Sequence, residues 1–173
     1  MIFRNKFLLG LLLAITAFSG CQKDDICPAS TQTTSLLIIR FYDIEDRETP
    51  QPPLNLRISA VGDTAIYTND LFNADSIAVP LRTDADITAY EFTFNYAEEE
   101  DPESPVEQNN TDTISFSYIR EQEYLNRACS FKIDYSGLKV EVEPGEDEAW
   151  IEDFQIEQEE VIDETEAHLS LYY

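Results

Sequence analysis

The stretch 87–96 alternates between apolar and polar side chains, and this alternation constrains the fold more than any other feature of the chain. The aromatic residues of the stretch fall on one face of an extended backbone: Tyr90, Phe92, Phe94 and Tyr96. A period of two belongs to a β-strand, whose successive side chains point to opposite faces. The aromatic row is either core or a platform on which sugar rings stack. The large apolar area of each ring favours core.

The same period recurs from residue 36 to the end of the sequence. Short strands are expected at 54–60, 65–68, 76–81, 113–120, 129–135, 138–142, 150–157 and 167–173. The stretch 36–42 is apolar on both faces apart from Arg40, so it is expected to be a central or covered strand. Glu121–Asn126 is expected to form one helical turn and Ser136-Gly137 a reverse turn, and no long segment has a helical period. About nine short strands predict an all-β fold, an antiparallel β-sandwich of immunoglobulin-like type, with a small β-barrel as the alternative.

An acidic stretch with two prolines, residues 97–110, interrupts the strands. Like charges at this density repel one another, so we expect a surface loop. The stretch lacks the ordered ligand spacing and the turn glycine of a calcium-binding loop. No metal site is predicted.

The N-terminus has the form of a secretory signal. Arg4 and Lys6 precede an apolar run over 7–18. This run of about 12 residues is shorter than the roughly 20 that a membrane-spanning helix needs. The small residues Ser19-Gly20 before Cys21 resemble the lipobox of bacterial lipoproteins, although Phe18 stands where that motif usually has Leu. The resemblance implies cleavage before Cys21 and acylation of its thiol. A plain signal peptide with an incidental cysteine is the alternative.

The residues after Cys21 carry a second signal. Gln22, Lys23, Asp24 and Asp25 resemble the surface-export signal of Bacteroidota lipoproteins, in which Lys and acidic residues follow the acylated cysteine. The alternative is a solvated tether. The chain thus divides into a signal peptide over 1–20, a lipidated cysteine and tether over 21–33, and a single β-domain over 34–173.

The charge of the mature chain excludes some partners. Arg4 and Lys6 leave with the signal peptide, so 9 of the 11 basic residues remain against 35 acidic ones, and 9 − 35 = −26. Such a charge argues against nucleic acid and against broad contact with an anionic membrane surface. A hydrophobic share of 43% is too high for a disordered acidic chain.

Two cysteines remain after Cys21 is acylated, Cys27 and Cys129. An even pair in an oxidising compartment is typical of a disulfide, and two buried thiols are the alternative.

The usual catalytic constellations are absent. His168 is the single histidine, which rules out a multi-histidine metal site and leaves no histidine base beyond this one for a nucleophile. We expect His168 to be structural or exposed. The mature chain keeps three glycines, too few for a glycine-rich phosphate loop. The sequence therefore predicts a protein that is not an enzyme and has no cofactor.

Three triplets resemble the O-glycosylation acceptor motif of Bacteroidota, in which a hydroxyl residue follows Asp. The acceptor side chains would be Thr64, Ser76 and Thr113. The alternative is that junctions between turns and strands favour this order of residues.

Several longer segments together resemble an uncharacterised family of Bacteroidota lipoproteins. They are Asp24–Cys27, Leu36–Asp43, Pro80–Asp86, Arg127–Lys132 and Thr165–Tyr172. The resemblance implies a lipoprotein and a matched Cys27–Cys129 pair, but no activity. Such proteins resemble companions of outer-membrane β-barrel proteins. The acidic insert at 98–107 is longer than the family pattern.

These observations predict a lipid-anchored protein of the outer membrane that faces the cell exterior. We expect a non-catalytic accessory or interaction subunit of an outer-membrane protein complex, with a β-barrel protein as partner and the membrane bound through the N-terminal lipid. A glycan- or ligand-binding surface module is the alternative.

Overall fold

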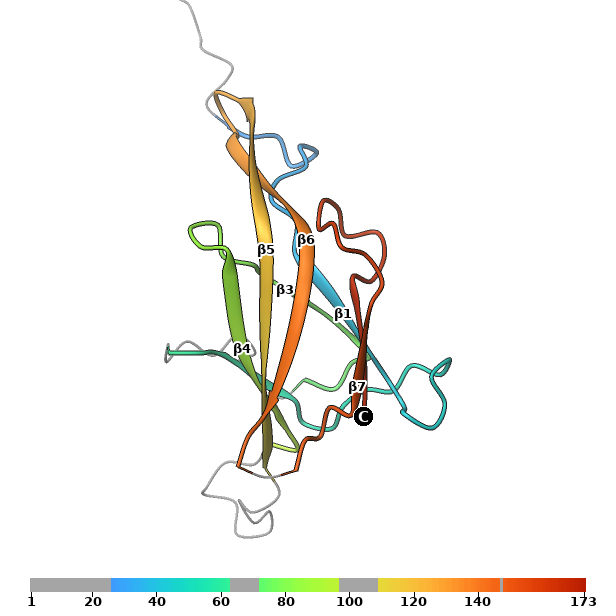
Figure 1. Ribbon diagram of the computed structural model, residues 1–173. Helices are drawn as coiled ribbons and strands as arrows, with labels where there is room; N and C mark the ends of the chain where they lie inside the picture. Colours follow the sequence, from blue (N-terminus) through green and yellow to red (C-terminus); the bar gives the residue numbers. More distant parts are fainter. Residues whose placement is uncertain (1–25, 63–71, 97–108, 147) are drawn as a thin grey trace, which may run out of the picture.

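The protein is described by a computed structural model that covers residues 26–62, 72–96, 109–146 and 148–173 (Figure 1). These residues form eight strands and no helix. The strands are β1 (Leu37–Tyr42), β2 (Arg57–Ala60), β3 (Ser76–Val79), β4 (Ile87–Phe94), β5 (Asn110–Asn126), β6 (Ser130–Pro144), β7 (Asp153–Ile156) and β8 (Leu169–Tyr172). The predicted strand at 65–68 lies outside the described residues.

The strands form two four-stranded sheets. The first sheet has the order β3-β1-β8-β7 and the second sheet the order β2-β4-β5-β6. The sheets are not closed into a barrel, and their inner faces share one apolar core. The predicted all-β sandwich is therefore confirmed, with eight strands instead of about nine in the described residues, and the small-barrel alternative is wrong.

One pair of strands departs from the predicted antiparallel arrangement. β1 and β8 run parallel, with Ile39 opposite Leu169 and Tyr42 opposite Tyr172, whereas the other strand pairs are antiparallel. Parallel neighbours need a long connection, and here the connection contains all six other strands. The alternation of side chains along one strand predicts which face of that strand is buried. It does not predict whether the neighbouring strand runs parallel or antiparallel to it.

The aromatic row of β4 belongs to the core. Tyr90 and Phe92 are buried, and the ring of Phe94 stacks on that of Trp150 with 5.3 Å between their centroids. Tyr96 lies at the margin, where the guanidinium of Arg57 is 4.3 Å from its ring centroid. The preference for core over a sugar-stacking platform is thus confirmed at Tyr90, Phe92 and Phe94, whereas Tyr96 is half-buried outside the core.

Two predictions of local structure are wrong, because β5 and β6 form one long hairpin. Glu121–Asn126, expected to be a helical turn, is the end of β5. Ser136-Gly137, expected to be a turn, lies inside β6, where Gly137 and Leu138 together face the single residue Tyr118. This β-bulge places Gly137 at φ 63°, a conformation that glycine adopts without strain. Both errors arise because the pairing partner, and not the local sequence, keeps these segments extended.

The far half of this hairpin, residues 119–134, extends past the sandwich, and we call it the arm (Figure 1). None of its residues is buried, whereas Tyr118 and Tyr135 at its base are. A two-stranded hairpin without a core is marginally stable in water. The arm therefore depends on contacts at its sides and at its end.

A disulfide supplies the contact at the end. Cys27 and Cys129 are bonded, with Cα atoms 4.7 Å apart and 102 residues between them in sequence, so the alternative of two buried thiols is wrong. Nearer the base, the Ile133 amide donates to Thr34 Oγ1 at 2.9 Å. The Lys132 ammonium lies 3.0 Å from a carboxylate oxygen of Glu123 and 3.0 Å from one of Asp134.

Replacing both cysteines, in Cys27→Ser with Cys129→Ser, is expected to lower the free energy of unfolding by roughly 4–5 kcal/mol in the chain-entropy model of a loop this long. Amide hydrogen exchange should quicken first in the arm, because the bond is its covalent attachment. Urea unfolding and exchange measured by mass spectrometry check both effects. Equal changes of protection in the arm and in β1 would contradict the view that the arm depends on this bond.

Candidate functional site

The first candidate site is the end of the arm, which we call the tip: residues 124–131 together with Ile26 and Cys27. Residues 127–129 form the loop between β5 and β6. Asn126 Oδ1 accepts hydrogen bonds from the amides of Ala128 at 2.9 Å and Cys129 at 2.8 Å. Ser130 takes a positive φ of 62° and returns the chain into β6. The loop is thus fixed by its own side chain and by the disulfide.

Large apolar side chains stand in solvent at the tip. Tyr124 and Phe131 face each other across the hairpin with ring centroids 5.2 Å apart. They are 58% and 52% exposed, and Ile26 is 83% exposed. Single exposed apolar residues are ordinary. A cluster of three at one end of the molecule indicates a contact surface.

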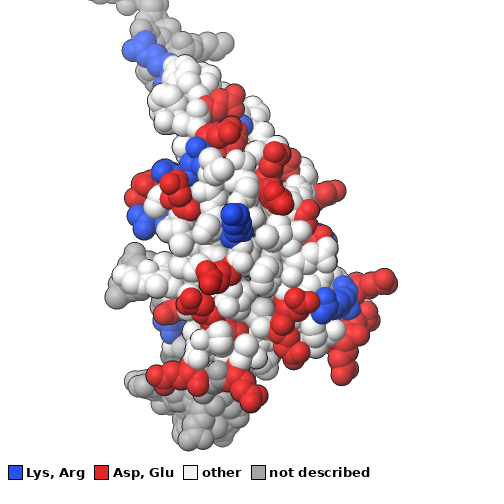
Figure 2. Space-filling view, in the orientation of Figure 1, with Lys and Arg blue, Asp and Glu red and all other residues white. Residues whose placement is uncertain are grey.

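The tip also differs from the rest of the protein in charge. No Asp or Glu occurs over 26–42 or over 124–131, and Arg127 is an exposed cation in the loop. The nearest acids of the hairpin, Glu123 and Asp134, are both paired with Lys132. Figure 2 shows uncharged and basic atoms at this end and acidic side chains spread over the body below it.

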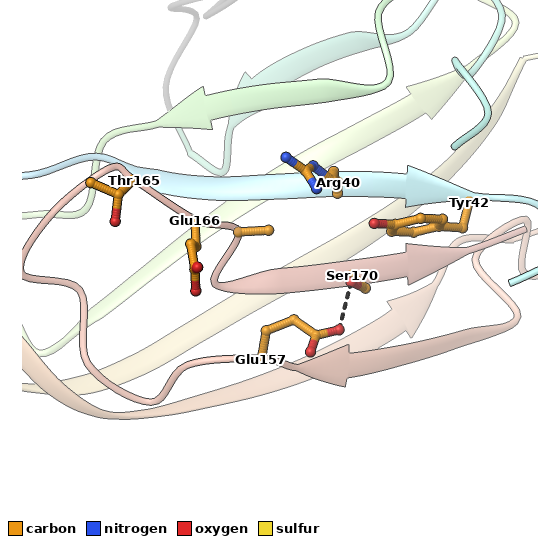
Figure 3. A pocket seen from close by; sticks show the side chains of 7 residues that line it. Arg40, Tyr42, Glu157, Thr165, Glu166 and Ser170 are labelled. Carbon is orange, nitrogen blue, oxygen red and sulfur yellow. Dashed lines mark hydrogen bonds between the residues drawn. The ribbon is translucent and has the colours of Figure 1, made fainter. Parts of the chain in front are cut away.

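The second candidate site is an open cleft of about 470 Å³ on the outer face of the first sheet, which we call the cleft (Figure 3). Its floor is made by β1 and β8, and one wall is made by the segment before β8. The residues that line it are Arg40, Tyr42, Glu157, Thr165, Glu166, Ala167 and Ser170.

Hydrogen bonds fix part of the cleft. Glu157 accepts from Ser170 Oγ at 2.8 Å and from Gln155 Nε2 at 3.2 Å (Figure 3). Arg40 is exposed and forms no ion pair within the described part of the chain. The ring of Tyr42 lies 5.7 Å from that of Tyr172. A guanidinium, an aromatic ring and the carboxylates of Glu157 and Glu166 can hold a small polar group that donates hydrogen bonds, whereas the two carboxylates disfavour an anion.

Arg47 covers the ring of Tyr172 on the outer face of the first sheet, next to the cleft. Its guanidinium lies 4.5 Å from the ring centroid of Tyr172 and 2.8 Å from a carboxylate oxygen of Asp153. This ion pair lowers the pKa of Asp153. Tyr172 is therefore buried although it is on the outer face of its sheet.

His168 lies just before β8 and has a structural role. It is 1% exposed, and its Nδ1 accepts a hydrogen bond of 2.9 Å from the amide of Ile38. Its own amide donates to the Ile38 carbonyl at 2.9 Å. Burial lowers the pKa of His168 from its ordinary 6.5, against the opposing influence of Asp163 and Glu164. The imidazole is held neutral because a protonated Nδ1 cannot accept the bond.

The free energy of unfolding is expected to fall as the pH drops below about 6.5, the pKa of an unfolded histidine. The unfolded chain binds a proton in this range, whereas His168 in the folded protein binds one only at lower pH. The stabilisation that neutral His168 gives the folded protein is therefore fully present above the pKa of the unfolded histidine. It is lost as the pH falls toward the lower pKa of His168 in the folded protein. Urea midpoints at pH 7.5, 6.5 and 5.5 check the trend.

His168→Asn is the matched control, because the Asn amide oxygen can accept from Ile38 without titrating in this range. The variant should lose this part of the pH dependence. If both proteins kept the same slope between pH 7.5 and 5.5, its assignment to His168 would be wrong.

The sequence interpretation missed a second buried polar group, Asp112. It is fully buried, and its Oδ2 accepts from the amides of Trp150 at 3.0 Å and Ile151 at 2.9 Å. These bonds hold the segment before β7 against β5. In the sequence, Asp112 is the first residue of a glycosylation-like triplet. Its position at the start of an alternating strand could have indicated that its side chain is buried.

The structure describes two of the three predicted glycosylation residues. Ser76 begins β3 and Thr113 lies within β5, and the structure places Ser76 half-buried at the strand start. Thr64 lies outside the described residues, as do Cys21 and the export-signal residues Gln22, Lys23, Asp24 and Asp25. Their roles stay predictions.

The described ranges contain neither a metal-binding cluster nor a membrane-spanning helix. No group of three or more His, Cys, Asp or Glu side chains there could hold a metal ion. Those ranges also contain no helix long and apolar enough to cross a membrane. The acidic residues 98–107 lie outside them.

A model of a family of unknown function, DUF6452, matches residues 55–173. The chain belongs to this family. The DUF6452 match includes β2 to β8 and Cys129, whereas β1 and Cys27 precede it. Comparison with curated proteins and with solved structures gives no match.

Proposed function

We propose that this DUF6452 protein is an outer-membrane lipoprotein, anchored by an acyl group on Cys21 and facing the cell exterior. It acts as a non-catalytic accessory or interaction subunit of an outer-membrane complex. The observation that carries the proposal is the Cys27–Cys129 disulfide, which joins the start of the domain to the tip of the arm. It sets how far the domain stands from its anchor.

The distance follows from chain geometry. Six residue steps lead from Cys21 to Cys27, and an extended chain spans about 3.5 Å per step, or roughly 20 Å in all. The disulfide then places Cys129, in the loop of the tip, next to Cys27. A domain attached in this way stays close to the bilayer and meets the membrane proteins beside it.

The arm supports a role in contact. Ile119, at its base, is 63% exposed, and the arm as a whole covers no core. A projecting hairpin with exposed apolar side chains gives a neighbouring protein a surface to pack on. The partner proposed is an outer-membrane β-barrel protein.

Cys21→Ala is the variant that tests the anchor. The protein should leave the membrane fraction upon a carbonate wash, and external protease should cut a C-terminal tag in wild-type cells. Cys21→Ser is a second variant without acylation and should behave in the same way. The proposal fails if the Cys21→Ala protein remains with the membrane after the wash.

The cleft favours the second candidate function, a glycan- or ligand-binding surface module. Arg40 and Tyr42 lie beside each other in Figure 3 with the carboxylates of Glu157 and Glu166 nearby, an arrangement suited to a neutral sugar, whose hydroxyls can donate to the carboxylates and accept from Arg40. Titration with glucuronate-containing and neutral oligosaccharides, followed by NMR, tests this function.

Arg40→Gln should weaken binding of the neutral sugar by about tenfold, since a charge-assisted hydrogen bond contributes roughly 1.5–3 kcal/mol. Arg57→Gln, remote from the cleft, is the control. Binding of the acidic sugar as tight as that of the neutral one, or no binding of either, would count against the cleft as a sugar site.

A further inference from the structure

We propose that the tip inserts into the headgroup region of the bilayer, so that the protein stands on the membrane with the long axis of the arm pointing into it. The side chains that enter are Tyr124, Phe131 and Ile26. This inference rests on the acyl anchor at Cys21 of the proposed function and adds a second, non-covalent contact with the lipid. The occupant of the apolar tip is thus the bilayer itself.

The first support is the length of chain between the anchor and the tip. Residues 22–25 separate Cys21 from Ile26, the first described residue, and Cys27 is bonded to the loop of the tip. The tip is the part of the domain nearest to the lipid by covalent path. The headgroup region extends about 5–7 Å beyond the hydrocarbon on each side, well within the reach of such a tether.

The second support is the chemistry of the exposed side chains. Tyr is enriched where membrane and water meet, because its ring is apolar and its hydroxyl remains hydrated. Tyr124 and Phe131 form a paired aromatic surface at the end of a hairpin, with Ile26 beside the disulfide. The arm provides no core in which these side chains could be buried.

The third support is the local charge. The whole mature chain is strongly acidic, and such a body is repelled from an anionic surface. Exposed charges more than about 8 Å apart are largely screened at physiological salt. The tip therefore presents its own charge: Arg127 is a cation, residues 124–131 contain no Asp or Glu, and in the sequence Lys23 of the tether stands beside Asp24 and Asp25, which precede Ile26. Lys132 offsets one of the two negative charges of Glu123 and Asp134, the first acids of the hairpin behind the tip. The acidic body remains on the water side.

Tyr124→Trp in the mature, acylated protein tests the insertion. The protein is reconstituted into phosphatidylcholine vesicles whose lipids carry bromine on the acyl chains, which quenches tryptophan at close range. Ile119→Trp is the matched control on the same strand, five residues nearer the body, or about 17 Å at 3.4 Å per residue. The native Trp150 is buried in the body and contributes the same background to both.

The Tyr124→Trp protein should be quenched at least about twofold more than the Ile119→Trp protein, as expected for a side chain in the interface. Adding Phe131→Ser to Tyr124→Trp should reduce the quenching, because the paired ring no longer enters. Equal quenching at both positions, or none at either, overturns the proposal. If the emission of the Tyr124→Trp protein changed with protein concentration and not with bromine, the tip would instead contact a second copy of the chain, and the proposal would be wrong.

A mass measurement on the protein used for quenching distinguishes failure of this inference from failure of the proposed function. Intact mass of the membrane-extracted protein shows whether Cys21 carries acyl groups, and a mass without them defeats the proposed function. Cys21 is then the one thiol outside the disulfide, so it can be coupled to a maleimide phospholipid and the quenching measured on that conjugate. Acylated protein without selective quenching at position 124 defeats the tip insertion alone.

Discussion

The arm depends on one covalent bond, the disulfide between Cys27 and Cys129. The sandwich below it is held by the usual burial of apolar side chains from two sheets. The arm has no such support, since none of residues 119–134 is buried. A bond that closes a loop of about a hundred residues restricts the unfolded chain and also fixes where the end of the hairpin lies relative to the start of the domain. The Cys27–Cys129 disulfide therefore both stabilises the folded protein and fixes the position of the end of the arm.

The surface charge and the apolar tip have complementary roles. Acidic side chains are spread over the body in Figure 2, and a net charge far from zero keeps a protein soluble and discourages non-specific association. The same charge would hinder any approach to an anionic surface. Confining the exposed aromatic pair to an end of the molecule without acids lets one region make contact while the body stays in water.

Much of the fold could be predicted from period-two alternation, because the two faces of a strand are encoded in adjacent residues. Tyr90 and Phe92 were assigned to the core on this basis, and both are buried. The parallel pairing of β1 with β8 could not be predicted, since the direction of a neighbour depends on residues far away in the chain. The same holds for the bulge at Gly137, which is defined by the residue opposite it.

The candidate sites were harder to foresee than the core. The two cysteines were identified as a pair, but their position at the end of a projecting hairpin depends on the length of β5 and β6, which local turn signals obscured. The cleft joins Arg40 and Ser170, which come together through the parallel pair.

The central position of β8 in the first sheet has a consequence for how the chain folds. Ile38 and His168 are hydrogen-bonded across 130 residues of sequence. The two middle strands of this sheet, β1 and β8, therefore come from opposite ends of the domain's sequence. Contacts between such distant segments form slowly. During synthesis, β1 can pair with β3 early, but its other edge stays unpaired until β8, the last strand of the chain's described residues, has emerged from the ribosome.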